Sequence, residues 1–165
     1  MQAREYTLFR EARALWQLTP TGKEAHLAEL AADAPDPVRQ AIHQHYPMFL
    51  EINESFKMLC GDWQLIDGNG ERPNDHTDST YDAKVIDRLA QLDAAARPVV
   101  TRMGVEHTRL APYAPRLGLA LGKVRAGENK MFTGVMCNSF HDVWMELHED
   151  LILTLGINRA AEGSF

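Results

Sequence analysis

Three histidines and the acidic residues near them are the side chains of this sequence best suited to bind a metal ion. His76 follows Asp75 in the segment NDHTD, and His141 and His148 occur close to the C-terminus. Histidines that chelate one ion from a single helix are normally four residues apart. His141 and His148 are seven residues apart, about 10.5 Å along a helix axis, so they cannot share one ion directly. A metal site that joins Asp75 or His76 to one of them stays open as an alternative.

The same histidines also fit an ordinary structural role or a role in ligand binding. In a helix, His141 and His148 align with Met145 and Ile152 on an apolar stripe, where a backbone carbonyl or a carboxylate would satisfy their ring nitrogens. A buried histidine paired with an aspartate would respond to pH. Helical bundles also host apolar pockets between helices. The residues predicted to line a small-molecule pocket are Trp63, His76, His141, Trp144 and His148.

Charged residues follow a second pattern. Basic residues recur every seven positions from Arg109 to Lys130, and acidic residues form a strip from Asp142 to Glu149. The spacing predicts an exposed basic ridge that meets acidic neighbours, although each exposed pair contributes little to stability. Contact with an anionic ligand is the functional alternative for this ridge.

Five helices are predicted to position these side chains. They span residues 20–32, about 36–59, 79–103, about 112–126 and 138–155, and the polar segment 61–78 is predicted to be a loop. Pro47 should kink or divide the second helix. The last helix is apolar over most of its circumference, which places it at the centre of the bundle. We expect a ligand pocket between this helix and the one predicted for residues 79–103.

Residues 5–19 have two possible structures. Their aromatic and β-favouring residues, with charged residues between them, indicate a two-stranded hairpin. One amphipathic helix is the alternative, because Leu8, Ala12 and Leu15 would share a face. A helix then begins at Thr19 and Pro20, a threonine N-cap followed by proline in the first turn.

The stretch from Leu8 to Leu30 resembles the closing part of a winged helix-turn-helix regulator of the MarR-like and PadR-like groups. In these groups a β-hairpin wing often ends in an LTPxG segment that leads into a dimerisation helix, and residues 18–22 read LTPTG. The resemblance implies that Arg10 and Arg13 contact the phosphate backbone of DNA. Residues 140–156 also resemble helical regions beside such winged helices in actinobacterial regulator-like proteins, a context to which no firm activity is attached. The family resemblance and the apolar helices together imply a homodimer, and we expect a small-molecule effector in the bundle.

The resemblance departs from the family pattern where DNA bases would be read. The sequence ahead of the hairpin is too short for the recognition helix, so we expect DNA binding only as part of a longer chain. A net charge of −6 and a pI near 5.6 likewise argue against DNA binding by this chain alone. No leader or long apolar run is evident, so we expect a cytoplasmic protein without a membrane partner.

Motifs of catalysis and cofactor binding are missing from the sequence. It contains no phosphate-binding glycine loop, no G-x-S-x-G elbow and no Cys-x-x-Cys pair. We therefore predict neither an enzymatic reaction nor a cofactor. The two cysteines, Cys60 and Cys137, do not form a disulfide framework and are expected to be small core residues, with oxidant sensing as the alternative.

The sequence thus predicts an all-α bundle of about five helices with a small N-terminal β-hairpin, the remnant of a wing. Residues 1–33 would form the hairpin and a linking helix, and residues 34–165 the bundle that binds an effector and dimerises. A metal-binding bundle or metal-dependent enzyme that uses His76, His141 and His148 is the second hypothesis. A protein-interaction module without a small-molecule site is the third.

Overall fold

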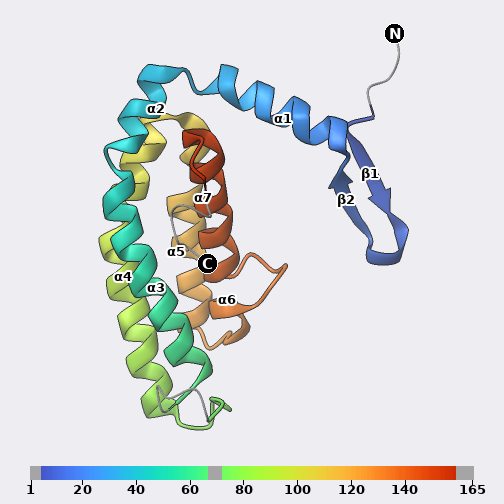
Figure 1. Ribbon diagram of the computed structural model, residues 1–165. Coiled ribbons are helices and arrows are strands. Elements are labelled where there is room, and N and C mark those ends of the chain that lie inside the picture. The colour runs from blue at the N-terminus through green and yellow to red at the C-terminus, as the bar shows by residue number, and fades with distance from the viewer. Residues whose placement is uncertain (1–4, 67–71, 159–165) are drawn as a thin grey trace.

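The computed structural model describes residues 5–66 and 72–158, and it confirms an all-α bundle with a small N-terminal hairpin (Figure 1). The hairpin and the helix after it project from one end of the bundle as an arm. The strands are β1 (Thr7–Arg10) and β2 (Leu15–Leu18), and the helices are α1 (Pro20–Asp33), α2 (Asp36–His43), α3 (Tyr46–Gln64), α4 (Ser79–Glu106), α5 (Tyr113–Arg125), α6 (Lys130–Thr133) and α7 (Phe140–Leu155).

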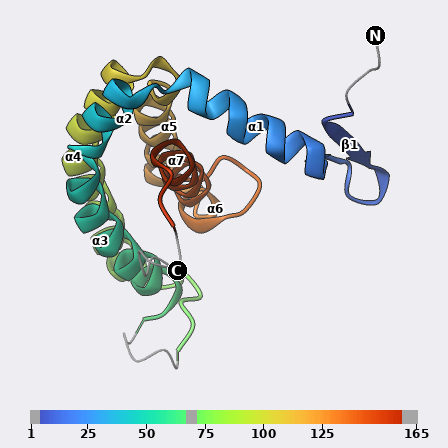
Figure 2. The ribbon, with the colours of Figure 1, turned by 45° about the horizontal axis from the view of Figure 1, so that its top comes forward.

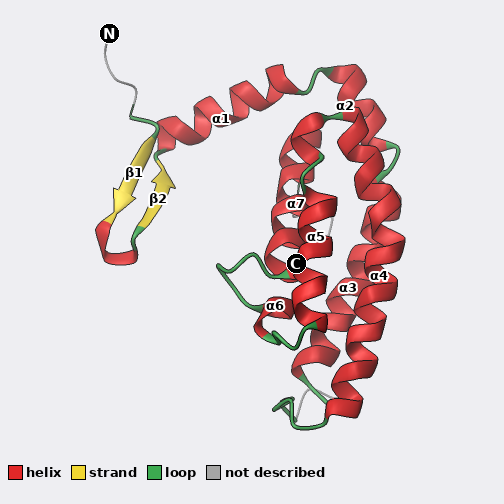
Figure 3. Ribbon diagram, turned by 180° about the vertical axis from the view of Figure 1, so that it is seen from behind, coloured by secondary structure: helices red, strands yellow, loops and turns green. Residues whose placement is uncertain are grey.

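Helix α7 lies at the centre of the bundle, as its apolar sequence predicts. In Figure 2 it sits inside an arc formed by α2, α3, α4 and α5. Its side chains Phe140, Val143, Trp144, Leu147 and Leu151 are completely buried. The two longest helices, α3 and α4, form an antiparallel pair along one side, and α5 packs beside α7 (Figure 3).

Prolines and glycines end the helices largely where the sequence predicts. Pro47 divides the predicted second helix, because α2 ends at His43 and α3 starts at Tyr46 with the proline in its first turn. Gly127 and Gly156 have positive φ angles of 89° and 66° just beyond the ends of α5 and α7.

The prediction of a loop from residue 61 is wrong for its first turn, because α3 continues to Gln64. Trp63 explains the difference. Its indole is 2% exposed and stacks on Phe132, with ring centroids 4.5 Å apart. Burial of so large an apolar side chain stabilises the last turn of α3 despite Gly61.

Residues 5–19 form the hairpin, so the alternative of a single helix is wrong. Phe9 pairs with Trp16 across the strands, and their rings are 5.2 Å apart. The hairpin is attached to α1 through Thr19. Its hydroxyl donates to the carbonyl of Glu5 at 2.8 Å and accepts from the amide of Gly22 at 3.0 Å. The amide of Thr19 also donates to the carbonyl of Tyr6.

Helix α1 contacts the bundle mainly through its C-terminal end. Leu30 and Ala34, just beyond the helix, are buried, whereas Leu27 one turn earlier is 54% exposed. Asp33 accepts hydrogen bonds from Arg109 Nε at 2.9 Å and lies 3.0 Å from His107 Nε2. The bond from Arg109 is the main cause that lowers the pKa of the Asp33 carboxyl. The base of the arm is therefore anchored, and the rest extends away from the bundle (Figure 1).

Gly22 is the residue whose substitution should separate the hairpin from α1. A Cβ at this position would lie 2.0 Å from the carbonyl oxygen of Tyr6, so Gly22→Ala must displace the strand. We expect faster amide hydrogen exchange in residues 5–19 and unchanged exchange in α7. Gly122→Ala is the control, because a Cβ there meets nothing within 4 Å. Unchanged exchange in the hairpin of Gly22→Ala would contradict the proposed attachment.

Candidate functional site

A buried polar group joins α3 to the central helix α7. The indole nitrogen of Trp144 donates to Asn53 Oδ1 at 2.9 Å, and both residues are at most 1% exposed. Phe49 stacks on Trp144, with ring centroids 5.0 Å apart. One turn further along α7, His148 Nε2 lies 3.4 Å from the hydroxyl of Tyr46. A buried indole N–H needs an acceptor, and Asn53 supplies it within an otherwise aromatic contact.

A cavity of about 570 Å³ lies next to this polar group, between α3 and α7. The volume is in the range of small-molecule sites. Its position differs from our expectation, which placed a pocket between α4 and α7. The lining residues come from one stripe of α3, one stripe of α7, and the end of α6 with the segment after it: Asn53, Phe56, Lys57, Cys60, Gly61, Gln64, Thr133, Val135, His141, Met145 and His148.

An open cleft lies on the other side of His141 and Met145, which line both spaces. The cleft has a volume of about 970 Å³ and runs between α1, α5 and α7. His26 of α1 and four acidic residues of α7 line it, among others. The cavity and the cleft beside the arm thus share His141 and Met145 in their linings.

His76 and Trp63 belong to a different cluster, at the junction of α3 and α4. His76 Nδ1 lies 3.0 Å from Asp82 Oδ2, and its ring packs against Trp63 with centroids 4.4 Å apart. Asn74 donates to Asp82 at 2.8 Å and to the carbonyl of Trp63 at 3.1 Å. His76 has a φ of 59°, uncommon for a residue other than glycine. This cluster holds Asn74 and His76 against the end of α3 and the start of α4.

The pocket predicted from the sequence is thus divided by the structure. His141 and His148 line the cavity, and Trp144 lies beneath it through its bond to Asn53. Trp63 and His76 lie in the α3–α4 cluster. Sequence analysis missed Asn53, although an amide on the stripe of Phe49 and Phe56 was a usable signal.

The four residues of the metal hypothesis are divided in the same way. His76 faces Asp82, while His141 and His148 line the cavity, and Asp75 bonds to Thr77. In the described part of the chain, no group of three or more His, Cys, Asp or Glu residues could hold a metal ion.

Two residues of the basic ridge, Arg109 and Arg116, meet acidic neighbours on α7, as the spacing predicts. Arg116 pairs with Glu146 at 2.6 Å, and its guanidinium lies over the ring of Tyr113. Arg109 pairs with Asp150 and donates to Thr154 at 2.8 Å. Arg109 thus contacts both α7 and Asp33 at the end of α1, which makes it an ionic link between the arm and the centre of the bundle.

Cys60 has the environment of an unreactive thiol. Burial raises its pKa to about 12, and the thiolate is the reactive form of cysteine. Cys137 is half-buried, and its backbone amide donates to Asp142 at 2.8 Å. Because a redox sensor needs a lowered thiol pKa, Cys60 does not fit that role.

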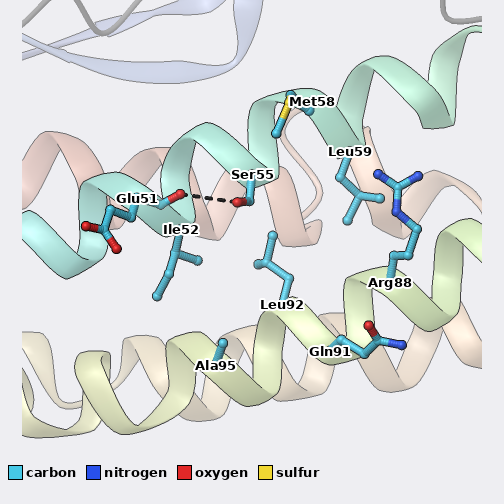
Figure 4. A pocket seen from close by; sticks show the side chains of 9 residues that line it. All are labelled: Glu51, Ile52, Ser55, Met58, Leu59, Arg88, Gln91, Leu92 and Ala95. Atoms are coloured by element: carbon cyan, nitrogen blue, oxygen red, sulfur yellow. Dashed lines mark hydrogen bonds between the residues drawn. The ribbon is translucent and has the colours of Figure 1, made fainter.

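A groove on the outer face of the α3–α4 pair is less suited to binding (Figure 4). Ile52 of α3 faces Leu92 and Ala95 of α4 across it, and Ser55 donates to the carbonyl of Glu51. Arg88 at its edge is paired with Asp62 at 2.6 Å. The groove holds no buried polar group comparable to Asn53 or His148.

Comparison of the chain with protein-family models, curated proteins and solved structures gives no match. Across residues 5–66 and 72–158, no helix combines the length and apolar character needed to cross a membrane. Function is therefore inferred from the arm and the cavity.

Asn53 should contribute to stability through its bond to Trp144. Asn53→Leu leaves the indole N–H buried without its acceptor, and we expect the free energy of unfolding to fall by about 1–3 kcal/mol in urea. The neighbouring Glu54→Ala is the control, because Glu54 is exposed and its carboxylate pairs with Lys57 on the surface. Equal stabilities of the two variants would show that the bond is unimportant.

Cys60 should react slowly with thiol reagents in the folded protein. A pKa of about 12 instead of 9.0 leaves about a thousandfold less thiolate near pH 8. In a Cys137→Ser background, we expect slow labelling in buffer and rapid labelling in denaturant. The folded state keeps this thiol protonated. The free energy of unfolding should therefore fall as the pH rises above the pKa of the thiol in the unfolded chain. Equal labelling rates in both states would contradict this environment.

Proposed function

We propose that this chain is the effector-binding and dimerisation region of a winged-helix transcriptional regulator in the cytoplasm. The observation that carries the proposal is the hairpin, fastened through Thr19 and Gly22 to a helix that projects from the bundle. This is the arrangement expected for a wing that leads into a dimerisation helix.

The energetics of the arm support a partner for it. A two-stranded hairpin is marginally stable in water by itself, and so is an isolated helix of 14 residues. Trp16 is 69% exposed and Leu27 54%, and Leu8 and Phe9 are exposed as well. Burial of a leucine or an aromatic side chain contributes about 1.5–3 kcal/mol. A second copy that packs its own arm against α1 would bury these residues symmetrically.

DNA contact in this proposal is limited to the backbone. Arg10 ends β1 at the exposed edge of the hairpin, with its Nε bonded to Gln17 at 3.0 Å, and Arg13 follows in the turn. Both arginines would contact phosphates and orient the protein without reading sequence. A recognition helix from a longer chain would read the bases, since the net charge of −6 opposes DNA binding by this region alone.

The dimer can be tested on Leu27. We expect the protein to be a dimer by light scattering coupled to size exclusion, and Leu27→Glu to be a monomer, because a buried unpaired carboxylate opposes association. Leu119→Glu, on α5 and 70% exposed, is the matched control and should remain a dimer. A monomeric wild-type protein would overturn the dimerisation role and favour an interaction module that binds another protein.

A further inference from the structure

The cavity between α3 and α7 has the construction of a ligand site with one polar and one apolar part. On α3 the lining residues recur at helical spacing from Asn53 to Gln64, and on α7 from His141 to His148. Phe56, Val135 and Met145 supply apolar walls. The ring of Phe56 and the imidazoles of His141 and His148 supply the aromatic part of the lining.

The charge of the lining is opposite in sign to that of the protein. The chain has 23 acidic residues and a net charge of −6, yet no Asp or Glu lines the cavity, which has Lys57, His141 and His148. The neighbouring cleft is lined by four acidic residues, Asp142, Glu146, Glu149 and Asp150, and by one arginine, Arg109. A small anion is therefore favoured in the cavity and opposed in the cleft.

His141 is the best-placed hydrogen-bond donor. Its Nδ1 is buried and has no hydrogen-bond partner in the described part of the chain. A buried ring nitrogen without a hydrogen-bond partner is costly, and a carboxylate placed beside it would accept a hydrogen bond from it. Lys57 extends from α3 beside Phe56, whose ring lies 6.2 Å from that of His141. Its ion pair with Glu54 is exposed and weak, which leaves the ammonium able to turn toward a ligand.

We propose that this cavity binds a monocarboxylate with an aliphatic body, which is the effector class of the region proposed above. The carboxylate accepts from Lys57 and His141, and the aliphatic part lies along Gly61, Val135 and Met145. The regulatory role of such a ligand rests on the proposed function. Binding of the ligand to the cavity does not depend on that function.

Gly61 allows the cavity to be filled without damage to the core. Gly61 belongs to α3 and lines the cavity, and a Cβ at this position meets nothing within 4 Å. Gly61→Leu should therefore fold, because leucine favours a helix more than glycine does, and its side chain occupies the space of the ligand. Gly122→Leu on α5 is the control, since that position is also open and lies outside the cavity lining.

The test measures binding of octanoate to the whole chain by calorimetry, with octylamine as a probe of equal length and opposite charge. We expect octanoate to bind at least about tenfold more tightly than octylamine. Gly61→Leu should lose binding, and Gly122→Leu should bind as the wild type does. Lys57→Gln should weaken octanoate about tenfold, while Lys84→Gln, an exposed lysine of α4, should have no effect.

Three results would overturn the proposal: no binding of octanoate at millimolar concentration, equal binding of octylamine, or undiminished binding by a folded Gly61→Leu variant. Far-ultraviolet circular dichroism and the melting temperature establish folding of each variant. Light scattering on the same samples keeps the two proposals apart. A monomer that binds octanoate would remove the dimerisation role alone, and a dimer that does not bind it would remove the ligand assignment alone.

Discussion

The buried indole of Trp144 is the constraint on which the rest of the bundle depends. Its ring is packed against Phe49 and Phe56, and its N–H requires an acceptor inside an apolar core. Asn53 meets that requirement at 2.9 Å and thereby ties α3 to α7 at one level. Next to this contact, the facing surfaces of α3 and α7 carry small or flexible residues, namely Gly61, Cys60 and Met145. A tight polar contact beside small side chains is a physical reason for a cavity there.

The arm and the bundle are stabilised by different kinds of interaction. The bundle buries aromatic and aliphatic side chains completely, and such burial is the dominant favourable term in folding. The arm is built from local hydrogen bonds at Thr19 and from the close approach of Gly22 to Tyr6. Local bonds define its shape but bury little apolar surface, so the arm stays exposed in a single chain. A structure of this kind is suited to association with a partner.

Local sequence signals predicted the ends of helices well because single residues decide them. Pro47 divides α2 from α3, and Gly156 ends α7 in a left-handed conformation. The hairpin was ambiguous because its residues also fit one face of a helix. The contacts that decide it join Thr19 to Glu5 and Gly22 to Tyr6, and periodicity does not contain this information.

The candidate site was only partly predictable, for a related reason. An apolar stripe shows that His141 and His148 face inward, but not which helix they face. That choice depends on the packing partner of α7, and α3 rather than α4 supplies the cavity wall. His76 does pair with an aspartate, but the partner is Asp82, in the first turn of the helix that follows His76 in the sequence. Short-range pairing of this kind could have been favoured over a distant one, because Asn74, His76 and Asp82 occur within nine residues.

The position of the cavity gives a physical route from ligand to arm. His141 and Met145 form a wall of both the cavity and the cleft beside α1. A ligand that draws His141 toward its carboxylate changes the surface against which α1 or a second copy would pack. Such a ligand can alter the arm only to the extent that it binds one arrangement more tightly than another. Arg109, which bonds to both Asp33 and Asp150, would carry a displacement of α7 to the base of the arm. Coupling would then follow from two shared side chains and one ionic link, without a rearrangement of the core around Trp144.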